Sequence, residues 1–356
     1  MKIGILNSHN QDYLHYVNAC KNLKVDYQVI NFIGKDWLSE CEKSGCDGFL
    51  VRPPCDFPER KAMYDERLIF LADKMKKPIY PGLGESLFYE NKRALVNWLD
   101  YYKLPHPKTF VLGSRKEAMD FVEKAKYPFV SKSAIGSSAS GVLIVKNKFQ
   151  AKILVNQFFG WGITGLTRGK TYWHWVKKKW LLPALGSEQK HYMIVQEFCP
   201  LLWEHRLIRI GDSYFGYKKV VGKNGFASGS GFAEWGKPPM EVLEKVREWT
   251  DMLGIRSMAI DVFETKNGEF LINEMQTVFG NKVTPLLSFD GKAGRFVYRN
   301  HQFEFEEDIE INEGNAPNKS SIEEMPISSY QKILERAVDY IEKAKECQNF
   351  VYNYRM

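Results

Sequence analysis

The sequence predicts an α/β fold, with a parallel sheet in the N-terminal part and a mixed α+β arrangement in the rest of the chain. Over residues 1 to about 90, short apolar strands alternate with helical patterns, as in a parallel sheet that helices cover. From Thr109 onward, strands also follow one another across short turns, as antiparallel pairs do. The chain has 356 residues, which is enough for two or three lobes.

Composition and charge narrow the class of protein. The hydrophobic fraction of 44% is ordinary for a globular protein, so we do not expect disorder. The net charge of +7, from 50 basic and 43 acidic residues, favours an anionic ligand. This charge is too small for a nucleic-acid footprint on a chain of this length, which argues against nucleic acid as the partner.

The N-terminus and the cysteines indicate a cytoplasmic protein. MKIGILNSHN reads as a strand and a turn, without the features of a signal peptide, and no apolar run approaches the length of a membrane helix. We therefore expect no membrane association. The cysteines form no CxxC pair and fit no common zinc spacing, so we expect reduced thiols at Cys20, Cys41, Cys46, Cys55, Cys199 and Cys347.

The first 90 residues contain four predicted strands and three helical patterns. The strands are Lys2–Leu6, Tyr27–Phe32, Gly48–Val51 and Pro78–Tyr80, and the helical patterns are Asp12–Asn22, Trp37–Lys43 and Glu59–Lys76. No G-x-G-x-x-G follows the first strand, so a dinucleotide fingerprint is absent. The turn at residues 7–10 either binds a ligand at the carboxyl end of a strand or simply caps the next helix.

The next segment ends a strand on a lysine. A helix over Asn91–Tyr102, a strand over Thr109–Leu112 and a helix from Ser114 to about Lys126 precede it. The apolar strand at 127–132 ends on Lys132, and the loop at 133–141 consists almost entirely of small residues before a strand over Val142–Val145. Such a loop can bring backbone N–H groups against a phosphate, although small-residue hairpin loops are common and this one is not a P-loop.

Residues 156–190 are rich in tryptophan and lysine. This pattern fits either a surface for nucleic acid or sugar or an amphipathic helix that packs its tryptophans inward. Apolar strands then follow at His191–Phe198, Glu204–Ile210 and Ser213–Val221, the last two joined by the turn Gly211-Asp212.

Later signals are fewer. A Gly/Ser-rich loop covers residues 222–236, and an amphipathic helix over Met240–Leu253 ends at Gly254. After residue 287 the chain shows an acidic patch at Glu304–Glu313 and a helix at about Ser328–Glu346.

A hairpin over Met258–Gly280 brings two carboxylates together. Asn267-Gly268 predicts a two-residue turn with positive φ at both positions. The register that follows pairs Val262 with Asn273 and Asp261 with Glu274, and it places Gln276 on the same face as Glu274.

Like charges directly opposite one another destabilise a sheet, so this pair predicts a cation between the strands. Two carboxylates and an amide oxygen suit Mg²⁺. The alternative is an exposed hairpin with solvated acids on one face.

The order of these parts resembles the ATP-grasp superfamily, and within it the carboxylate–amine ligases. The ordered set comprises the βαβ domain, a helix that opens on Asn91-Lys92, Lys132 with its small-residue loop, Gln196-Glu197-Phe198, Glu204 and the Asp261/Glu274 hairpin. The resemblance covers roughly residues 1–285. It implies an N-terminal α/β domain at 1–90, a central lobe at 91–195, a second lobe at 196–290 that closes on ATP with the first, and an extension at 291–356.

The resemblance also implies roles for individual residues. Lys92 and Lys132 would contact the ATP phosphates, and the loop with Ser137 and Ser138 would fold over them. Gln196, Glu197, Phe198 and Cys199 would hold the adenine, and Glu204 the ribose. Asp261, Glu274 and Gln276 would bind Mg²⁺, as two ions, with Mn²⁺ as an alternative. Arg206 and Lys218 would face the phosphates or the reacting carboxylate, and Ser230 would lie beside the acceptor.

Two positions depart from the family pattern. The family usually carries Asn where this chain has Gln276, and its ligases often carry Arg where this chain has Ala259. A different cation, such as Arg206, Lys219 or Lys223, would have to neutralise the acyl intermediate.

The resemblance implies an ATP-dependent ligase that joins a carboxylate to an amine through an acyl phosphate, with an amino acid, peptide or amino sugar as substrate. The alternatives are a kinase or other phosphoryl transferase on the same fold, and a nucleotide-binding protein without catalysis. A homodimer is compatible with the resemblance, since many relatives associate.

Overall fold

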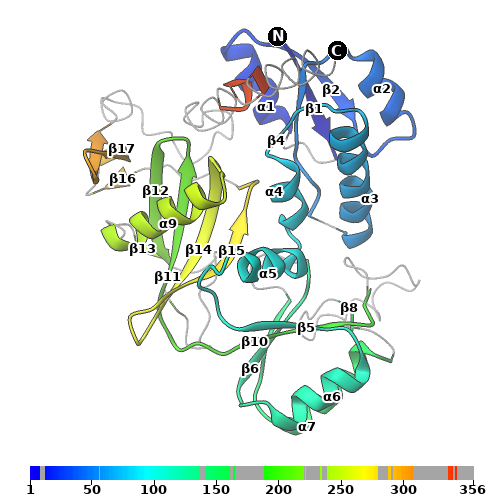
Figure 1. Ribbon diagram of the computed structural model, residues 1–356, viewed down its shortest axis with the longest axis vertical. Coiled ribbons are helices and arrows are strands. Elements are labelled where there is room, and N and C mark those ends of the chain that lie inside the picture. Colours follow the sequence, from blue (N-terminus) through cyan, green and yellow to red (C-terminus); the bar gives the residue numbers. More distant parts are fainter. Residues whose placement is uncertain are drawn as a thin grey trace, which may run out of the picture.

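The computed structural model describes residues 1–8, 13–55, 57–135, 141–160, 163–164, 188–219, 221, 233–234, 239–279, 288–289, 292–307, 336–339 and 341–342. Figure 1 shows an elongated arrangement, with the N-terminal sheet at one end of the long axis and helices α6 (Arg115–Lys124) and α7 (Lys148–Phe158) at the other. The largest sheet lies between them and to one side. The mixed α/β prediction is confirmed.

The N-terminal sheet is parallel, as the alternating pattern predicted. Its strands β1 (Lys2–Asn7), β2 (Asp26–Asn31), β3 (Gly48–Leu50) and β4 (Ile79–Tyr80) follow the order β2-β1-β3-β4. Its helices are α1 (Leu14–Asn22), α2 (Trp37–Lys43) and α3 (Pro58–Ile69), which the π-helical turn η2 (Phe70–Lys74) extends. Because side chains alternate along a strand, one face of β1 buries Leu6 against α2 and α3, and the other buries Ile3 and Ile5.

Two helices lead to the second sheet. The short helix α4 (Leu83–Phe88) was not foreseen, whereas α5 (Lys92–Tyr101) was. Asn91 caps α5, since its side chain accepts a hydrogen bond from the backbone N–H of Ala94 at 3.3 Å. The cap places Lys92 at the first turn of α5.

The second sheet is antiparallel and carries helices on one face (Figure 1). Its strands β5 (Thr109–Leu112), β6 (Phe129–Lys132), β7 (Val142–Val145) and β10 (Met193–Glu197) follow the order β5-β10-β6-β7. Helices α6 (Arg115–Lys124) and α7 (Lys148–Phe158) pack on it through Val122, Val155 and Phe158. Strands β8 (Ile163–Thr164) and β9 (Glu188–Gln189) pair with each other.

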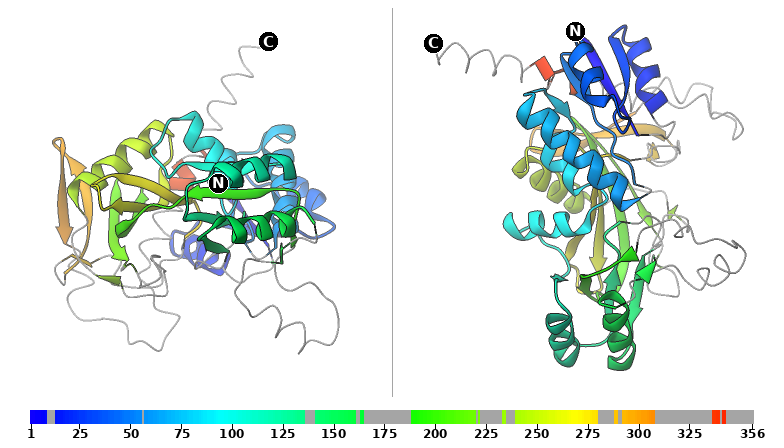
Figure 2. Two further views of the ribbon diagram at one scale, coloured as in Figure 1. Left: turned by 90° about the horizontal axis from the view of Figure 1, so that it is seen from below. Right: turned by 90° about the vertical axis from the view of Figure 1, so that its right-hand side faces the viewer.

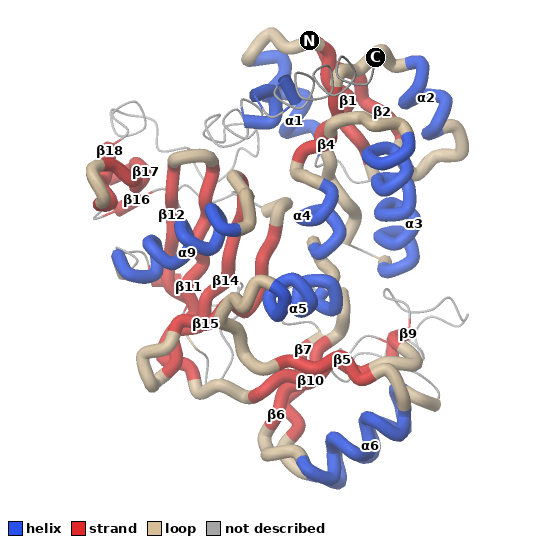
Figure 3. The backbone as a smooth tube through the Cα atoms, in the orientation of Figure 1, coloured by secondary structure: helices blue, strands red, loops and turns tan. Residues whose placement is uncertain are grey.

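The largest sheet is also antiparallel. Its path runs β15 (Phe270–Gln276), β14 (Ser257–Thr265), β11 (Leu201–Ile210), β12 (Ser213–Lys219), β17 (Lys292–Arg299) and β16 (Ser288–Phe289), with β13 (Ala233–Glu234) on β12 and β18 (Gln302–Glu307) on β17. Figure 3 shows the tube of β11, β12, β14 and β15 running side by side. Strands β16 to β18 were not predicted, and the first part of the predicted acidic patch is strand β18.

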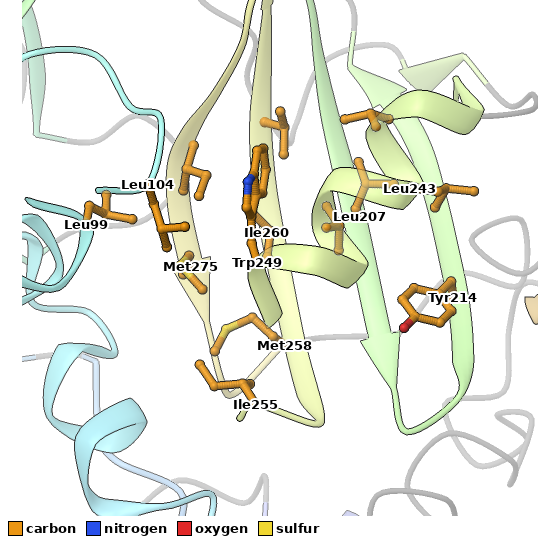
Figure 4. Packing of buried hydrophobic residues seen from close by; sticks show 14 of the residues in the cluster. Leu99, Leu104, Leu207, Tyr214, Leu243, Trp249, Ile255, Met258, Ile260 and Met275 are labelled. Atoms are coloured by element: carbon orange, nitrogen blue, oxygen red, sulfur yellow. The ribbon is translucent and has the colours of Figure 1, made fainter. Parts of the chain in front are cut away.

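Helix α9 (Met240–Met252) covers one face of this sheet. Figure 4 shows Leu243 and Trp249 of α9 packed over Leu207, Met258 and Ile260. Leu99 of α5 joins the same cluster. The helix therefore buries one face of β11 and β14 and leaves the other face for different contacts.

Part of that other face packs against the N-terminal sheet. Ile208, Phe215 and Ala259 belong to one buried cluster with Ile3 and Ile5 of β1. Ala337, in the described part of the predicted C-terminal helix, lies in the same cluster. In Figure 2, the N-terminal sheet lies at one end of the large sheet.

Two further expectations concern cysteines and membranes. The cysteines that the structure describes, Cys20, Cys41, Cys46, Cys55 and Cys199, are free thiols, while Cys347 lies outside the described residues. Among the described helices, none has the length and apolar character that crossing a membrane requires.

Candidate functional site

The β14/β15 hairpin brings Asp261 opposite Glu274, as predicted, but by a different register. The backbone N–H of Thr265 donates to the carbonyl oxygen of Glu269, so the loop has three residues instead of two. Within this loop, positive φ is confined to Gly268, at +80°. Val262 consequently pairs with Ile272 and not with Asn273. An irregularity between Asp261 and Val262 then restores the predicted pairing of the two acids.

The residue that this irregularity displaces is Asn273. Its Oδ1 accepts a hydrogen bond from Lys132 Nζ at 2.8 Å, which joins the hairpin to β6 of the second sheet. No functional role was predicted for Asn273 from the sequence. Its signal was an amide in a strand interior, where Asn is disfavoured, and this indicates a bulge only once the turn type is known.

Arg206 and Lys219 surround Asp261. Arg206 Nη1 donates to both carboxylate oxygens of Asp261 at 3.1 Å, and Arg206 Nη2 donates to Gln276 Oε1 at 2.8 Å. Lys219 Nζ donates to Asp261 Oδ2 at 2.7 Å and to Glu204 Oε1 at 2.8 Å. The result is a buried network of two cations and two carboxylates, with an amide at its edge.

Burial and charge act in opposite directions in this network. For Asp261, burial raises the pKa, but the charges of Arg206 and Lys219 outweigh it and hold the pKa below its usual value. For Lys219, burial lowers the pKa, but Asp261 and Glu204 raise it above the usual value. For Glu204, burial dominates over the attraction of Lys219 and raises the pKa to about 7. Asp261 is therefore the fully charged acid of the network.

Lys218 does not take part in this network, and the structure corrects its predicted placement. Its Nζ lies 5.0 Å from the centre of the Trp203 ring, on the face opposite to Lys219. The two-residue turn at Gly211-Asp212 could have revealed this. It pairs Ile210 with Ser213, and counting back along both strands then pairs Glu204 with Lys219.

Ala259 faces Gln276 across the hairpin and is buried in the cluster that joins the large sheet to the N-terminal sheet. An arginine at this position would have to place its guanidinium among apolar side chains. Arg206 contacts Gln276 from the neighbouring strand instead, so the structure provides a cation close to this position. Gln276 also donates to Glu90 Oε1 at 3.4 Å, which links the hairpin to the end of α4.

The two lysines predicted to bind phosphate come together from different elements. Lys132 ends β6, and Lys92 begins α5, with its Nζ 3.9 Å from Glu274 Oε1. Burial and then the charge of Lys92 lower the pKa of Lys132, Glu274 acts in the opposite direction, and the net result is a pKa of about 8. A buried lysine beside a second lysine favours an anionic ligand.

These lysines line a pocket that also includes Gln196, Asn273 and apolar side chains of α5. Gln196 is buried at the end of β10 and donates to Thr109 Oγ1 at 2.9 Å. Glu197 is exposed, and Phe198 and Cys199 are partly exposed. Burial raises the pKa of the Cys199 thiol to about 11, so this side chain is neutral.

Some predicted site residues are placed differently or lie outside the described residues. Glu204, expected beside a ribose, is buried and bonded to Lys219, so contact with a ribose would require it to exchange that partner. Ser137, Ser138 and Ser230 fall in segments that the structure does not describe, as do residues 165–187 of the tryptophan-rich region.

The donor set fits Mg²⁺ in its chemistry. Asp261 and Glu274 are carboxylates on facing positions of one hairpin, and Gln276 adds an amide oxygen. Within the described ranges, no three His, Cys, Asp or Glu side chains gather in a way that could hold a metal ion. A metal bound here would therefore need oxygen ligands from water or from a bound molecule.

Solved structures of known proteins share this architecture. No protein-family model and no curated protein matches the chain. Among solved structures, it is similar to a RimK domain ATP-grasp protein from Sphaerobacter thermophilus, with a TM-score of 0.52, 16% identity and coverage of 79% of this chain and 93% of that one.

It is also similar to carboxyaminoimidazole ribonucleotide synthase from Aspergillus clavatus complexed with ATP, with a TM-score of 0.52, 12% identity and coverage of 79% and 70%. A further structure from Aspergillus clavatus, N5-carboxyaminoimidazole synthase in complex with ADP and 5-aminoimidazole ribonucleotide, matches with a TM-score of 0.50, 11% identity and the same coverage. At such identities the likeness establishes the fold: the chain has the ATP-grasp fold.

Proposed function

We propose that this chain, which has the ATP-grasp fold, is an ATP-dependent ligase. It would activate a substrate carboxylate as an acyl phosphate and join it to an amine, with release of ADP and phosphate. One observation carries the proposal: Lys92, Lys132 and Asn273, from three separate parts of the chain, line one pocket, and Glu274 Oε1 lies 3.9 Å from Lys92 Nζ. Cations and oxygen ligands at one pocket suit the phosphates of a nucleotide and its metal.

The bound molecules of the similar structures guide the choice of nucleotide. One structure from Aspergillus clavatus holds ATP, and another holds ADP with an aminoimidazole ribonucleotide. We assign ATP to the pocket of this chain by analogy. Lys92 and Lys132 would bind its phosphates, and residues 196–199 would line the adenine. Asp261, Glu274 and Gln276 would hold Mg²⁺ or Mn²⁺, which neutralises phosphate charge when bound.

The chain's own residues would act by positioning and charge. In the acyl phosphate, negative charge develops next to the reacting carboxylate, and a fixed cation there stabilises it. Arg206 is the best-placed residue for this role, because it already lies against Asp261 and Gln276. Asp261 and Glu204 hold Lys219 in the same network, and Ser230 remains a proposed contact for the acceptor. No covalent nucleophile is required.

A screen for ADP release tests the reaction class. Amino acids, amino sugars and small peptides would be supplied singly and in pairs with ATP and Mg²⁺. A ligase should release ADP and inorganic phosphate together, and only with compounds that between them supply a carboxylate and an amine. Release of ADP without inorganic phosphate would instead identify a phosphoryl transferase, and binding of ATP without release under every condition would identify a non-catalytic nucleotide-binding protein.

Glu274→Ala is expected to abolish substrate-dependent ADP release while leaving the thermal unfolding temperature close to that of the wild type. The fold should tolerate the change because Glu274 is partly exposed and the Nζ of Lys92 lies 3.9 Å from its Oε1. Glu269→Ala removes an exposed acid from the same hairpin and serves as the control. Unchanged turnover in Glu274→Ala would contradict the metal assignment.

Nucleotide affinity should also depend on pH through Lys132. Its pKa is about 8 in the folded protein, below the ordinary value of 10.5, and a bound phosphate would raise it again. The affinity is therefore complete below about pH 8 and falls by up to about tenfold per pH unit above it. Titration calorimetry with ADP between about pH 6.5 and about pH 9.5, a range that brackets the pKa of Lys132, measures this effect. Lys132→Arg, which keeps its charge, should remove the decline, and an equal decline in that variant would exclude Lys132 as its source.

A further inference from the structure

Arg206 occupies the oxygen atoms that a metal ion would need. Its Nη1 donates to both oxygens of Asp261 at 3.1 Å, and its Nη2 donates to Gln276 Oε1 at 2.8 Å. One guanidinium thus joins two of the three proposed metal ligands. Hydrogen bonds from a charged guanidinium to a carboxylate are among the stronger hydrogen bonds in proteins.

A divalent cation cannot simply share these oxygens with Arg206. Both carboxylate oxygens of Asp261 already accept hydrogen bonds from Arg206, and Lys219 adds another bond to Oδ2 at 2.7 Å. Asp261 is buried, so repulsion between the metal and these cations would be weakly screened. Glu274 is held more loosely than Asp261, because its Oε1 is 3.9 Å from Lys92 Nζ.

Nucleotide phosphates would change this balance in two ways. A phosphate offers Arg206 charged acceptor oxygens, two of which can accept from one guanidinium and replace the oxygens of Asp261 and Gln276. The same phosphate supplies oxygen ligands to Mg²⁺, which commonly binds proteins through one or two carboxylates plus substrate phosphates. Both changes favour metal entry in the presence of the nucleotide.

We propose that Arg206 is a positioning residue that excludes free divalent cations from the hairpin until a nucleotide phosphate draws its guanidinium away from Asp261 and Gln276. The inference rests on the proposed function, because it takes the hairpin as the metal site of that function. It goes further because it makes Arg206 responsible for the order in which the nucleotide and the metal bind. The metal enters together with the nucleotide, and the hairpin has little affinity for metal alone.

Binding of Mn²⁺ tests the proposal without measuring catalysis. Water-proton relaxation detects Mn²⁺ when it is held by a macromolecule, and it can be recorded with and without a non-hydrolysable ATP analogue. The wild-type chain should give enhancement only with the analogue. Arg206→Met should give enhancement without it, with an apparent affinity about ten to a hundred times higher than that of the wild type.

Two further variants keep the test decisive. Lys218→Met removes the same charge from the neighbouring strand, but on the opposite face of the sheet, so it should behave like the wild type. Arg206→Lys keeps a charge but has a single compact head that cannot bond Asp261 and Gln276 as a fork. Its nucleotide-free affinity for Mn²⁺ should lie between those of the wild type and Arg206→Met, and this comparison also serves if Arg206→Met fails to fold.

The outcomes that would contradict the proposal distinguish the role of Arg206 from the existence of the metal site. Enhancement in the wild-type chain without the analogue would overturn the role of Arg206 and leave the metal site standing. The same conclusion follows if Arg206→Met and Arg206→Lys bind Mn²⁺ only with the analogue, as the wild type does. Absence of enhancement in every variant, even with the analogue, would overturn the metal assignment of the proposed function itself.

Discussion

Asp261→Ala is expected to lower the free energy of unfolding by about 3 to 5 kcal/mol. This carboxylate is the shared partner of Arg206 and Lys219, and all three side chains are largely buried. Among the described residues, its removal leaves Arg206 bonded to the Gln276 amide and Lys219 bonded to Glu204. Breaking one member of a buried ionic network is costly because the remaining charges lose their compensation while they stay out of water. Urea denaturation followed by tryptophan fluorescence measures the change.

Glu274→Ala provides the matched comparison on the opposite strand. Glu274 pairs with Asp261 in the ladder but is partly exposed, with Lys92 Nζ 3.9 Å away. Its loss should cost less than about 1 kcal/mol. Equal losses in the two variants would show that Asp261 owes its effect to its place in the hairpin and not to its two cations.

Lys219→Met is the second large effect, and it should depend on pH. The variant leaves Glu204 and Asp261 in the buried network with Arg206 as the remaining cation, and we expect a loss of about 3 to 5 kcal/mol at pH 8. Glu204 has a pKa of about 7 in the folded protein, already above its ordinary value of 4.5, and loss of Lys219 would raise it further. A raised folded-state pKa means that the folded protein binds the proton more tightly. Both proteins lose stability equally through Glu204 between about pH 4.5 and 7, so the loss caused by the substitution should be smallest below about pH 7 and grow as the pH rises towards the folded-state pKa of the variant.

Lys218→Met is the control for this prediction. Lys218 is the preceding residue of the same strand, and its charge lies over the Trp203 ring. We expect a loss of about 1 kcal/mol or less, the range of a cation–π contact, without the same dependence on pH. Urea denaturation at about pH 5 and about pH 8, below and above the folded-state pKa of Glu204, compares the two variants. A larger effect of Lys218→Met would contradict the assignment of the two faces of β12.

The hairpin illustrates both the reach and the limit of local sequence rules. Alternation of side chains and the Asn267-Gly268 signal correctly brought Asp261 opposite Glu274. The assumed two-residue loop was wrong, because only Gly268 adopts positive φ, and the displaced Asn273 corrected the register before the two acids. Turn type and bulge each shift the pairing by one residue, so the error cancelled at Asp261 and persisted at Val262.

The strand β12 shows a case in which a local signal was present but not followed through. The turn at Gly211-Asp212 was recognised, and a two-residue loop there already pairs Glu204 with Lys219. Pursuing that register would have placed Lys219, and not Lys218, on the face of Asp261. Because side chains alternate with a period of two, an error of one residue selects the wrong face entirely.

The sequence by itself determined the parallel N-terminal sheet, the cap at Asn91 and the facing acids of the hairpin, since each depends on periodicity and turn chemistry within a short segment. Only the tertiary structure decided that Lys132 meets Asn273, 141 residues away, and that Arg206 holds Asp261 and Gln276. It also decided that Ala259 is buried against the N-terminal sheet. Contacts between sheets depend on how separate elements pack and on which face each buries, and no local pattern along the chain carries that information.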